Sequence, residues 1–178
     1  MTGTIDGPDG RPRCSWCAAA PEFPAYHDTE WGFPVADDRR LFEKLCLEGF
    51  QSGLSWRTIL NKRENFRAAF DGFEFTRIAE YGPRDIDRLL GDAGIVRHRG
   101  KIEAVIGNAR LARSMTETGD TLAAYFWRFE PDPGGLAAPL GVSTSAESVA
   151  LSKDLKKRGW RFVGPTTVYA FMQAMGLV

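Results

Sequence analysis

Apolar residues recur at helical spacing along almost the whole chain, and no convincing run alternates apolar with polar residues. One such stripe contains Leu41, Phe42 and Leu45, and similar stripes follow to the C-terminal end. The pattern predicts an all-α fold, a single compact two-lobed domain with short connections over residues 13–178. Residues 1–12 are rich in Gly, Pro and Asp, which predicts a flexible N-terminal tail.

Residues that favour helix starts divide this domain into its elements. Ser, Thr and Asp cap helix N-termini, and Pro is favoured at the first helical position. The predicted starts are Asp37 or Asp38, Ser55, Pro83, Thr121, a capping box at Thr144–Glu147, and Pro165. A stretch rich in Pro, Gly and Ala over Pro131–Gly141 predicts a loop.

Composition excludes several classes of protein. Aromatic residues make up 12% of the chain, which is ample material for a core and argues against disorder. No apolar run approaches the roughly 18 residues of a membrane span. The N-terminus has no apolar signal-peptide region, so a cytoplasmic location without membrane attachment is expected. An odd count of three cysteines argues against a disulfide framework.

The charges of the chain balance, with 23 Lys and Arg against 23 Asp and Glu. Binding to nucleic acid would therefore depend on local basic patches rather than on net charge. Two candidates are Arg97–Lys101 and Lys153–Arg161, although either could be an ordinary solvated helix face.

A short segment bounded by two glycines, Gly159–Gly164, joins the last two predicted helices. A tight turn followed by a helix N-terminus can offer backbone N–H groups to a phosphate. The segment thus has the outline of a helix-hairpin-helix element. Two helices that merely pack around a glycine turn would give the same pattern.

Glu48 lies on the apolar stripe of its helix, where a carboxylate is costly unless it is paired or meets a charged ligand. The alternative is that the helix ends at Gly49 and Glu48 turns outward. Leu54 lies in a glycine-containing turn shortly after it, where an apolar residue either packs in the core or acts as a wedge in a base stack. Tyr26 and Trp31 precede this region and Trp56 follows it.

Several flat side chains near one carboxylate suit a flat cationic heteroaromatic ligand. In a small helical domain, such aromatics can equally be core residues. Cys14, Cys17 and His27 are three soft metal donors, one fewer than tetrahedral zinc requires.

Long motifs in a fixed order make the chain resemble the 3-methyladenine DNA glycosylase I family of the helix-hairpin-helix superfamily. The likeness runs from about residue 13 to the end. The motifs that carry it are Arg13–Trp16, Tyr26–Gly32, Leu41–Glu43, Leu47–Trp56, Lys62–Phe66, Asp92–Ile102, Gly107–Arg110 and Leu155–Gly164.

The resemblance implies a base-excision enzyme that hydrolyses the N-glycosidic bond of 3-methyladenine in alkylated double-stranded DNA and releases the free base. It implies Glu48 as the catalytic and base-recognition residue. Base-binding residues would be Tyr26, Trp56, Trp16, Trp31 and Phe23, where Phe23 replaces a tyrosine found in some members. DNA-binding residues would be Gln51, Gly53, Leu54, Gly159, Trp160, Arg161 and Gly164.

A lyase activity would need an amine nucleophile, and no Lys follows the hairpin at Pro165–Thr167. A monofunctional glycosylase is therefore expected. We also expect the protein to act as a monomer and without a catalytic cofactor. The alternative is a non-catalytic protein that binds alkylated DNA on the same fold. The family also implies a structural zinc, for which Cys14 and His27 match one pair of ligands and Cys17 is a further candidate. The family's C-terminal ligands are absent from this chain, which ends at Val178.

Overall fold

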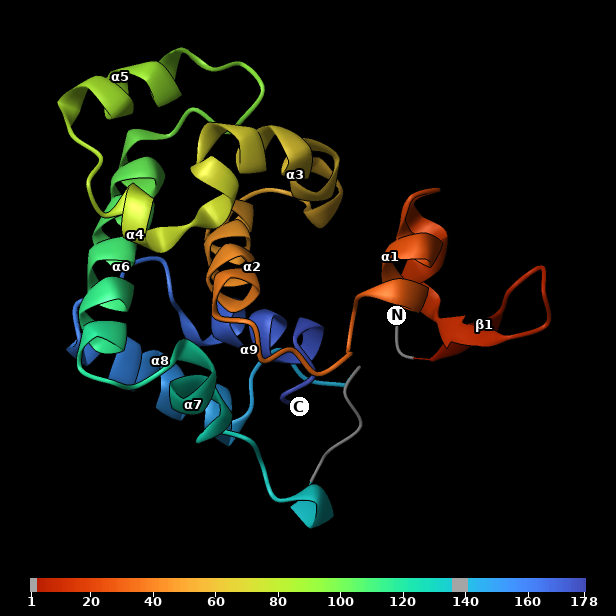
Figure 1. Ribbon diagram of the computed structural model, residues 1–178. Coiled ribbons are helices and arrows are strands. Elements are labelled where there is room, and N and C mark those ends of the chain that lie inside the picture. The colour runs from red at the N-terminus through yellow and green to blue at the C-terminus, as the bar shows by residue number, and fades with distance from the viewer. Residues whose placement is uncertain (1–2, 136–140) are drawn as a thin grey trace.

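Helices build nearly all of the fold in the computed structural model, which describes residues 3–135 and 141–178 (Figure 1). Three of the elements, labelled η, are short 3-10 helices. In chain order the elements are β1 (Thr4–Asp6), β2 (Pro12–Cys14), η1 (Ser15–Ala19), α1 (Phe23–Thr29), α2 (Asp38–Gln51), α3 (Trp56–Ala69), η2 (Asp71–Phe73), α4 (Phe75–Ile78), α5 (Pro83–Gly91), α6 (Arg99–Glu117), α7 (Leu122–Trp127), η3 (Pro133–Gly135), α8 (Ala146–Lys157) and α9 (Pro165–Ala174).

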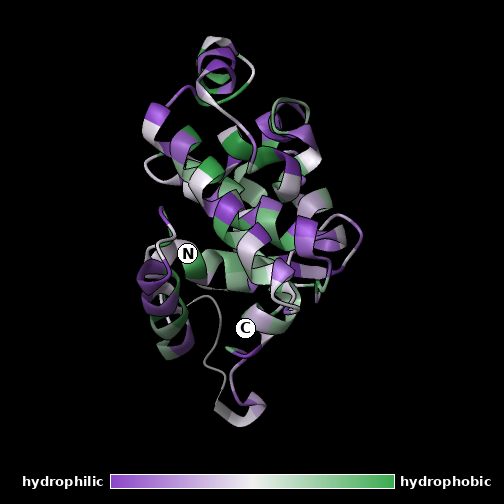
Figure 2. Cartoon of the chain, turned by 60° about the vertical axis from the view of Figure 1, so that its left-hand side comes forward, coloured by the Kyte–Doolittle hydropathy of each residue, from purple (hydrophilic) through white to green (hydrophobic). Residues whose placement is uncertain are grey.

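Helix α2 is the centre of the molecule, because every residue from Leu41 to Phe50 is buried. Helices α3, α6, α7 and α9 pack around it. A helix covered on all sides is expected to lie in a core, and Figure 2 shows hydrophobic residues gathered along these inner helices. The active-site candidate Glu48 therefore belongs to a helix that is buried along most of its length.

Most predicted helix starts are confirmed. The Ser55 and Thr121 side chains accept hydrogen bonds from the amides of Thr58 and Ala124, and α5 and α9 begin at prolines. The capping box at Thr144–Glu147 is wrong by one residue. Ser145 is the cap because α8 begins at Ala146. It exchanges hydrogen bonds with Ser148, which is therefore at the third helical position that a capping box requires.

The choice between Asp37 and Asp38 is settled by a long-range contact. Asp37 caps α2 by accepting a hydrogen bond from the Arg40 amide at 2.8 Å. The Asp38 carboxylate instead accepts from the amides of Leu122 and Ala123 at 3.1 and 2.9 Å. One aspartate thus caps its own helix, while its neighbour fixes the start of α7 against α2.

A small β-hairpin near the N-terminus was not predicted. Strands β1 and β2 pair antiparallel, with Thr4 opposite Cys14, within a region that the sequence assigned mainly to a tail. Strands of three residues are too short to give an alternating pattern. The flexibility of residues 1–12 stays a prediction, and residues 136–140 of the predicted Pro131–Gly141 loop lie outside the described part of the chain.

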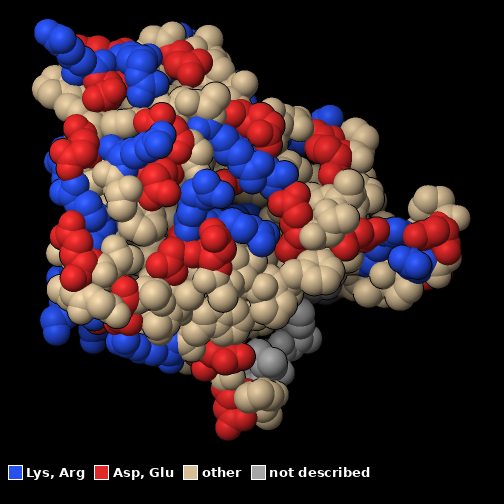
Figure 3. Space-filling model, in the orientation of Figure 1, with Lys and Arg blue, Asp and Glu red and all other residues tan. Residues whose placement is uncertain are grey.

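The helices divide into two groups, which agrees with a two-lobed arrangement (Figure 1). Helices α3, α4 and α5 form one end and α7, α8 and α9 the other, with α2 and α6 extending between them. Helix α1 and the hairpin lie to one side. Basic and acidic side chains are interspersed over the face in Figure 3. Within residues 3–135 and 141–178, no helix has the length and apolar character needed to cross a bilayer.

Candidate active site

Glu48 is buried with 5% of its surface exposed, and its carboxylate is paired. The partner is Lys44, one helical turn earlier, with 2.7 Å between Lys44 Nζ and Glu48 Oε1. The alternative in which Glu48 turns outward to solvent is therefore wrong. An uncompensated charge at this depth would be costly, and Lys44 supplies the opposite charge that the Glu48 carboxylate requires.

The aromatic residues singled out in the sequence lie around one cavity beside Glu48. It has a volume of about 250 Å³, near the small end of ligand-binding sites. Tyr26 and Trp56 are neighbours in its wall, with ring centroids 5.5 Å apart. The cavity is lined by Trp16, Phe23, Tyr26, Trp31, Glu48, Gln51, Trp56, Ala170 and Gln173. An open cavity here contradicts the reading in which the aromatics serve only as core.

Lys44 is the functional candidate that the sequence reasoning missed. Its ammonium donates to the Tyr26 hydroxyl at 2.8 Å and lies 3.4 Å from the centroid of the Trp56 ring. Burial raises the pKa of the Tyr26 phenol, and the nearby Lys44 charge partly opposes that shift. The available signal was spacing, since residues four apart share one helix face, which puts Lys44 directly beside Glu48.

The turn between α2 and α3 projects an apolar side chain. Leu54 is 42% exposed, and Gly53 before it has φ of +79°, a conformation that favours glycine. A groove of about 350 Å³ runs past this turn and is lined by residues that include Leu54, Thr166 and Thr167. Glu48, Gln51 and Ala170 line both the groove and the aromatic cavity, so the two spaces adjoin.

The Gly159–Gly164 segment forms a tight connection with a positive φ at Gly159 and at Phe162. In the described part of the chain, the amides of Phe162, Val163 and Gly164 donate no hydrogen bond. Phe162 and Gly164 are partly exposed, so their unpaired amides before the N-terminus of α9 are a suitable surface for a phosphate, whereas Val163 is only 2% exposed. The Arg161 side chain is exposed beside them.

Trp160 differs from the other hairpin candidates, because its side chain is only 3% exposed. Its ring packs against Phe42 and Phe126 in the core. Any contact with DNA at this position would use the backbone. The hairpin is also held from α6, where the Asn108 side chain exchanges two hydrogen bonds of 3.0 Å with the backbone of Arg161.

The predicted basic patches are less basic than their sequences indicated. Lys101 is 7% exposed and donates to the carbonyls of Phe50 and Ser52 at 2.9 and 2.6 Å, which removes it from the Arg97–Lys101 surface. It was wrong to count Lys101 as a solvated charge. In the second patch, Arg158 pairs with Asp154 at 2.7 Å, whereas Lys153, Lys156 and Lys157 are exposed.

The soft donors Cys14, Cys17 and His27 do not form a metal site in this geometry. Among the described residues, no group of three or more Cys, His, Asp or Glu side chains is placed to hold an ion. His27 Nδ1 lies 2.9 Å from an Asp28 carboxylate oxygen. Burial raises the pKa of the Cys17 thiol to about 11. Structural zinc stays a prediction that the arrangement of these residues does not support.

Comparisons with known proteins agree with this geometry. The family model described as methyladenine glycosylase matches residues 16–178. DNA-3-methyladenine glycosylase 1 of Escherichia coli (strain K12) is 50% identical over 171 residues, covering 93% of this chain and 91% of that protein. A crystal structure of a 3-methyladenine DNA glycosylase I superimposes with a TM-score of 0.86 at 48% identity, covering 93% of both chains.

A second solved structure shows a substituted 3-methyladenine DNA glycosylase I in complex with 3-methyladenine. It is 36% identical, with a TM-score of 0.81, and the match covers 89% of this chain and 87% of that one. The family model spans nearly the whole chain, and it includes Glu48, the aromatic cavity, the Leu54 turn and the hairpin. The chain belongs to the methyladenine glycosylase family.

Proposed function

We propose that this protein removes 3-methyladenine from alkylated DNA by hydrolysing the N-glycosidic bond, as a base-excision repair glycosylase. The observation that carries the proposal is the buried Glu48 carboxylate in an aromatic-walled cavity that opens beside the exposed Leu54 turn. Membership of the methyladenine glycosylase family and the relatives' activity point the same way.

The cavity suits the chemistry of this lesion. Methylation at N3 makes adenine in DNA a cation and weakens its bond to the sugar, so the enzyme does not need to protonate the leaving base. It needs to unstack the nucleotide, hold the base and complement its charge. Tyr26 and Trp56 offer flat faces for stacking, and Glu48 offers the negative charge. Neutral adenine would gain less from Glu48, which favours the damaged base.

The surface around the cavity suits a nucleotide turned out of a duplex. Leu54 would fill the space that the base leaves. The amides of Phe162 and Gly164 and the Arg161 side chain would hold the backbone. Helix α6 connects these two contacts, because Lys101 bonds to the end of α2 and Asn108 to the hairpin. Flipping and backbone binding would thus share one rigid support.

The cavity offers no amine nucleophile for a lyase step. Lys44 is the nearest candidate, but its ammonium is ion-paired with Glu48 and lines a second, smaller cavity rather than the aromatic one. This arrangement supports hydrolysis with release of the free base, which would leave an intact abasic strand. Monomeric action and a cytoplasmic location stay predictions.

The test is to incubate the protein with methylated duplex DNA, to identify released bases by chromatography and to analyse the strand. We expect free 3-methyladenine, and strand breaks only after alkali treatment. Breaks before alkali would contradict the monofunctional chemistry. A folded protein that binds the damaged DNA but releases no base would instead be the non-catalytic binder.

A further inference from the structure

We infer that Lys44 is a positioning residue for Glu48, whose carboxylate it pairs with and holds directed toward the aromatic cavity. The inference rests on the proposed function, because it assigns a role within the same site. It concerns a side chain that lines only the far side of the cavity wall, where the base itself would not reach.

Lys44 is fixed by three contacts at once. Its Nζ atom is 2.7 Å from Glu48 Oε1 and 2.8 Å from the Tyr26 hydroxyl, and it lies over the Trp56 ring. The side chains of Lys44 and Glu48 are 7% and 5% exposed. A long, flexible lysine held this way has lost its rotamer freedom, so it defines where the carboxylate points.

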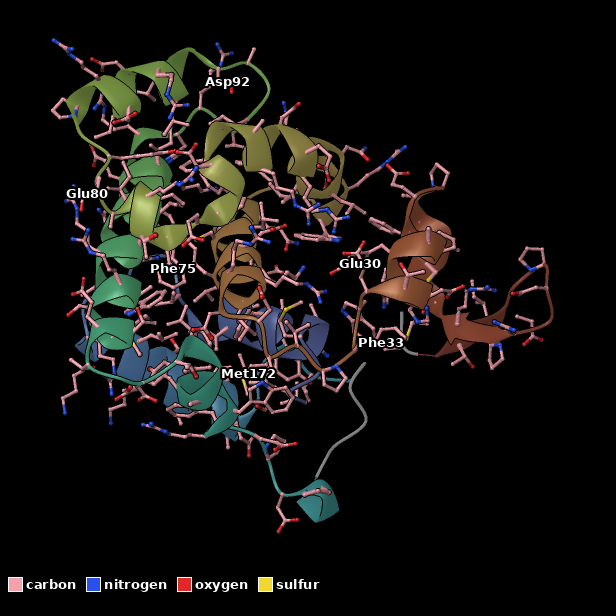
Figure 4. The ribbon with its side chains drawn as sticks, viewed as in Figure 1. Glu30, Phe33, Phe75, Glu80, Asp92 and Met172 are labelled. Carbon is pink, nitrogen blue, oxygen red and sulfur yellow. The ribbon has the colours of Figure 1, made fainter. Side chains whose placement is uncertain are left out.

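Four of the other charged residues near Lys44 are paired among themselves. A cavity of about 40 Å³ behind the wall formed by Tyr26 and Trp56 is lined by these charged residues together with Lys44. Glu30 extends from the α1 side into the space facing α2 and α3 (Figure 4), where it pairs with Arg63 at 2.6 Å. Arg67 pairs with Glu43 at 2.7 Å.

The other residues that line the aromatic cavity with Glu48 carry no formal charge at neutral pH. They include Tyr26 from α1, Gln51 from α2, Trp56 from α3, and Ala170 and Gln173 from α9. Helix α9 contains no charged residue, and its titratable side chain is Tyr169. The exposed Arg40 also lines the small cavity. Among the described residues, Lys44 is the cation that balances Glu48.

Two consequences follow for the site. Since an ammonium can only donate, the Tyr26 oxygen accepts from Lys44, which leaves the Tyr26 O–H free to donate elsewhere. Without Lys44, the buried Glu48 carboxylate would have no cation to fix its direction. It would then present its charge less well to the cationic base.

The test compares single-turnover excision by the wild type, Lys44→Met, Lys44→Gln, Lys44→Arg and Glu48→Gln from about pH 5 to pH 9. We expect Lys44→Met and Lys44→Gln to lose about tenfold in excision rate, which is equivalent to about 1.4 kcal/mol. The loss is expected because the Glu48 carboxylate is no longer held toward the cavity by an ion pair. Lys44→Arg keeps the charge and should stay close to the wild type.

The second part is a double-mutant cycle. In the Glu48→Gln background, Lys44→Met should change the rate by less than about twofold, because Lys44 acts through Glu48. Arg84→Met, which removes an exposed cation of α5, is the matched control and should match the wild type. Thermal unfolding checks that each variant is folded. If Lys44→Met does not fold, Lys44→Gln takes its place in the cycle.

The inference is overturned if the pH profiles of the folded Lys44 variants superimpose on that of the wild type. It is equally overturned if Lys44→Met costs as much in the Glu48→Gln background as in the wild type. Failure of the proposed function would look different, since the wild-type protein itself would then release no 3-methyladenine.

Discussion

Substitution of Lys101 tests how the turn that carries Leu54 is held in place, because one buried ammonium bonds to the backbone of that turn. It donates to the Phe50 carbonyl at 2.9 Å and to the Ser52 carbonyl at 2.6 Å. Both carbonyls belong to the end of α2, where helical carbonyls have no partner of their own. Burial lowers the pKa of this lysine, and the two carbonyls are its compensating contacts.

Lys101→Met keeps much of the apolar stem and removes both hydrogen bonds. A hydrogen bond from a charged group contributes about 1.5–3 kcal/mol, and the carbonyl of the exposed Ser52 can bond to water instead. We therefore expect a destabilisation of roughly 2–3 kcal/mol, which lowers the melting temperature by about 4–12 °C for a chain of this length. Arg97→Met, an exposed cation from the same segment, should leave the melting temperature unchanged.

The functional effect should be selective. A loosened turn places Leu54 less well, so excision from duplex DNA should fall about tenfold, equivalent to about 1.4 kcal/mol. The affinity for free 3-methyladenine, followed by the fluorescence of the cavity tryptophans, should be unchanged. An equal loss of free-base affinity, or a variant as stable and as active as the wild type, would refute the role given to Lys101.

Three further substitutions separate the wedge, the hairpin and the N-terminal region. Leu54→Ala should lower the rate of excision from duplex DNA about tenfold. The free energy of unfolding should change by less than about 0.5 kcal/mol, since the side chain is exposed. Equal excision rates for the variant and the wild type would show that Leu54 does not act as a wedge. Asn108→Ala should destabilise the fold by about 2–3 kcal/mol, because it removes two hydrogen bonds to the Arg161 backbone. It should also weaken DNA binding while the affinity for the free base is retained. Unchanged DNA binding would show that the hairpin is not part of the DNA-binding surface. Arg13, with a smaller contribution from His27, lowers the pKa of Asp28 from 3.8 to about 2, so this stabilisation is present above pH 3.8 and is lost as pH falls toward about 2. Urea unfolding should therefore show wild type and Arg13→Met differing most above about pH 4 and converging near pH 2, and a gap that widens on acidification would contradict it.

The sequence predicted the helices well because their signals are local. Ser55 and Thr121 cap helices through hydrogen bonds to residues three positions away, which spacing alone anticipates. Ser145 shows the limit, since neighbouring Thr and Ser are chemically equivalent caps and the choice depends on register. The β-hairpin at Thr4–Cys14 was missed because its short strands carry no periodic signal.

The site was predictable in its residues but not in its charge balance. The position of Glu48 on an apolar stripe predicted a buried carboxylate, and Figure 4 shows the crowded interior that receives such side chains. Lys44 and Lys101 look like ordinary helix-surface lysines in the sequence, yet both are buried. Their burial depends on partners such as Tyr26 and Phe50, which only the tertiary structure brings into contact.

The central claim is that Glu48 recognises and stabilises the cationic base. The most direct measurement is single-turnover release of 3-methyladenine by Glu48→Gln beside Glu43→Gln, a buried acid on the same helix that faces the smaller cavity. We predict that Glu48→Gln loses at least about hundredfold in rate while folding and DNA binding are retained, and that Glu43→Gln keeps its rate. Release by Glu48→Gln at the wild-type rate would contradict the account.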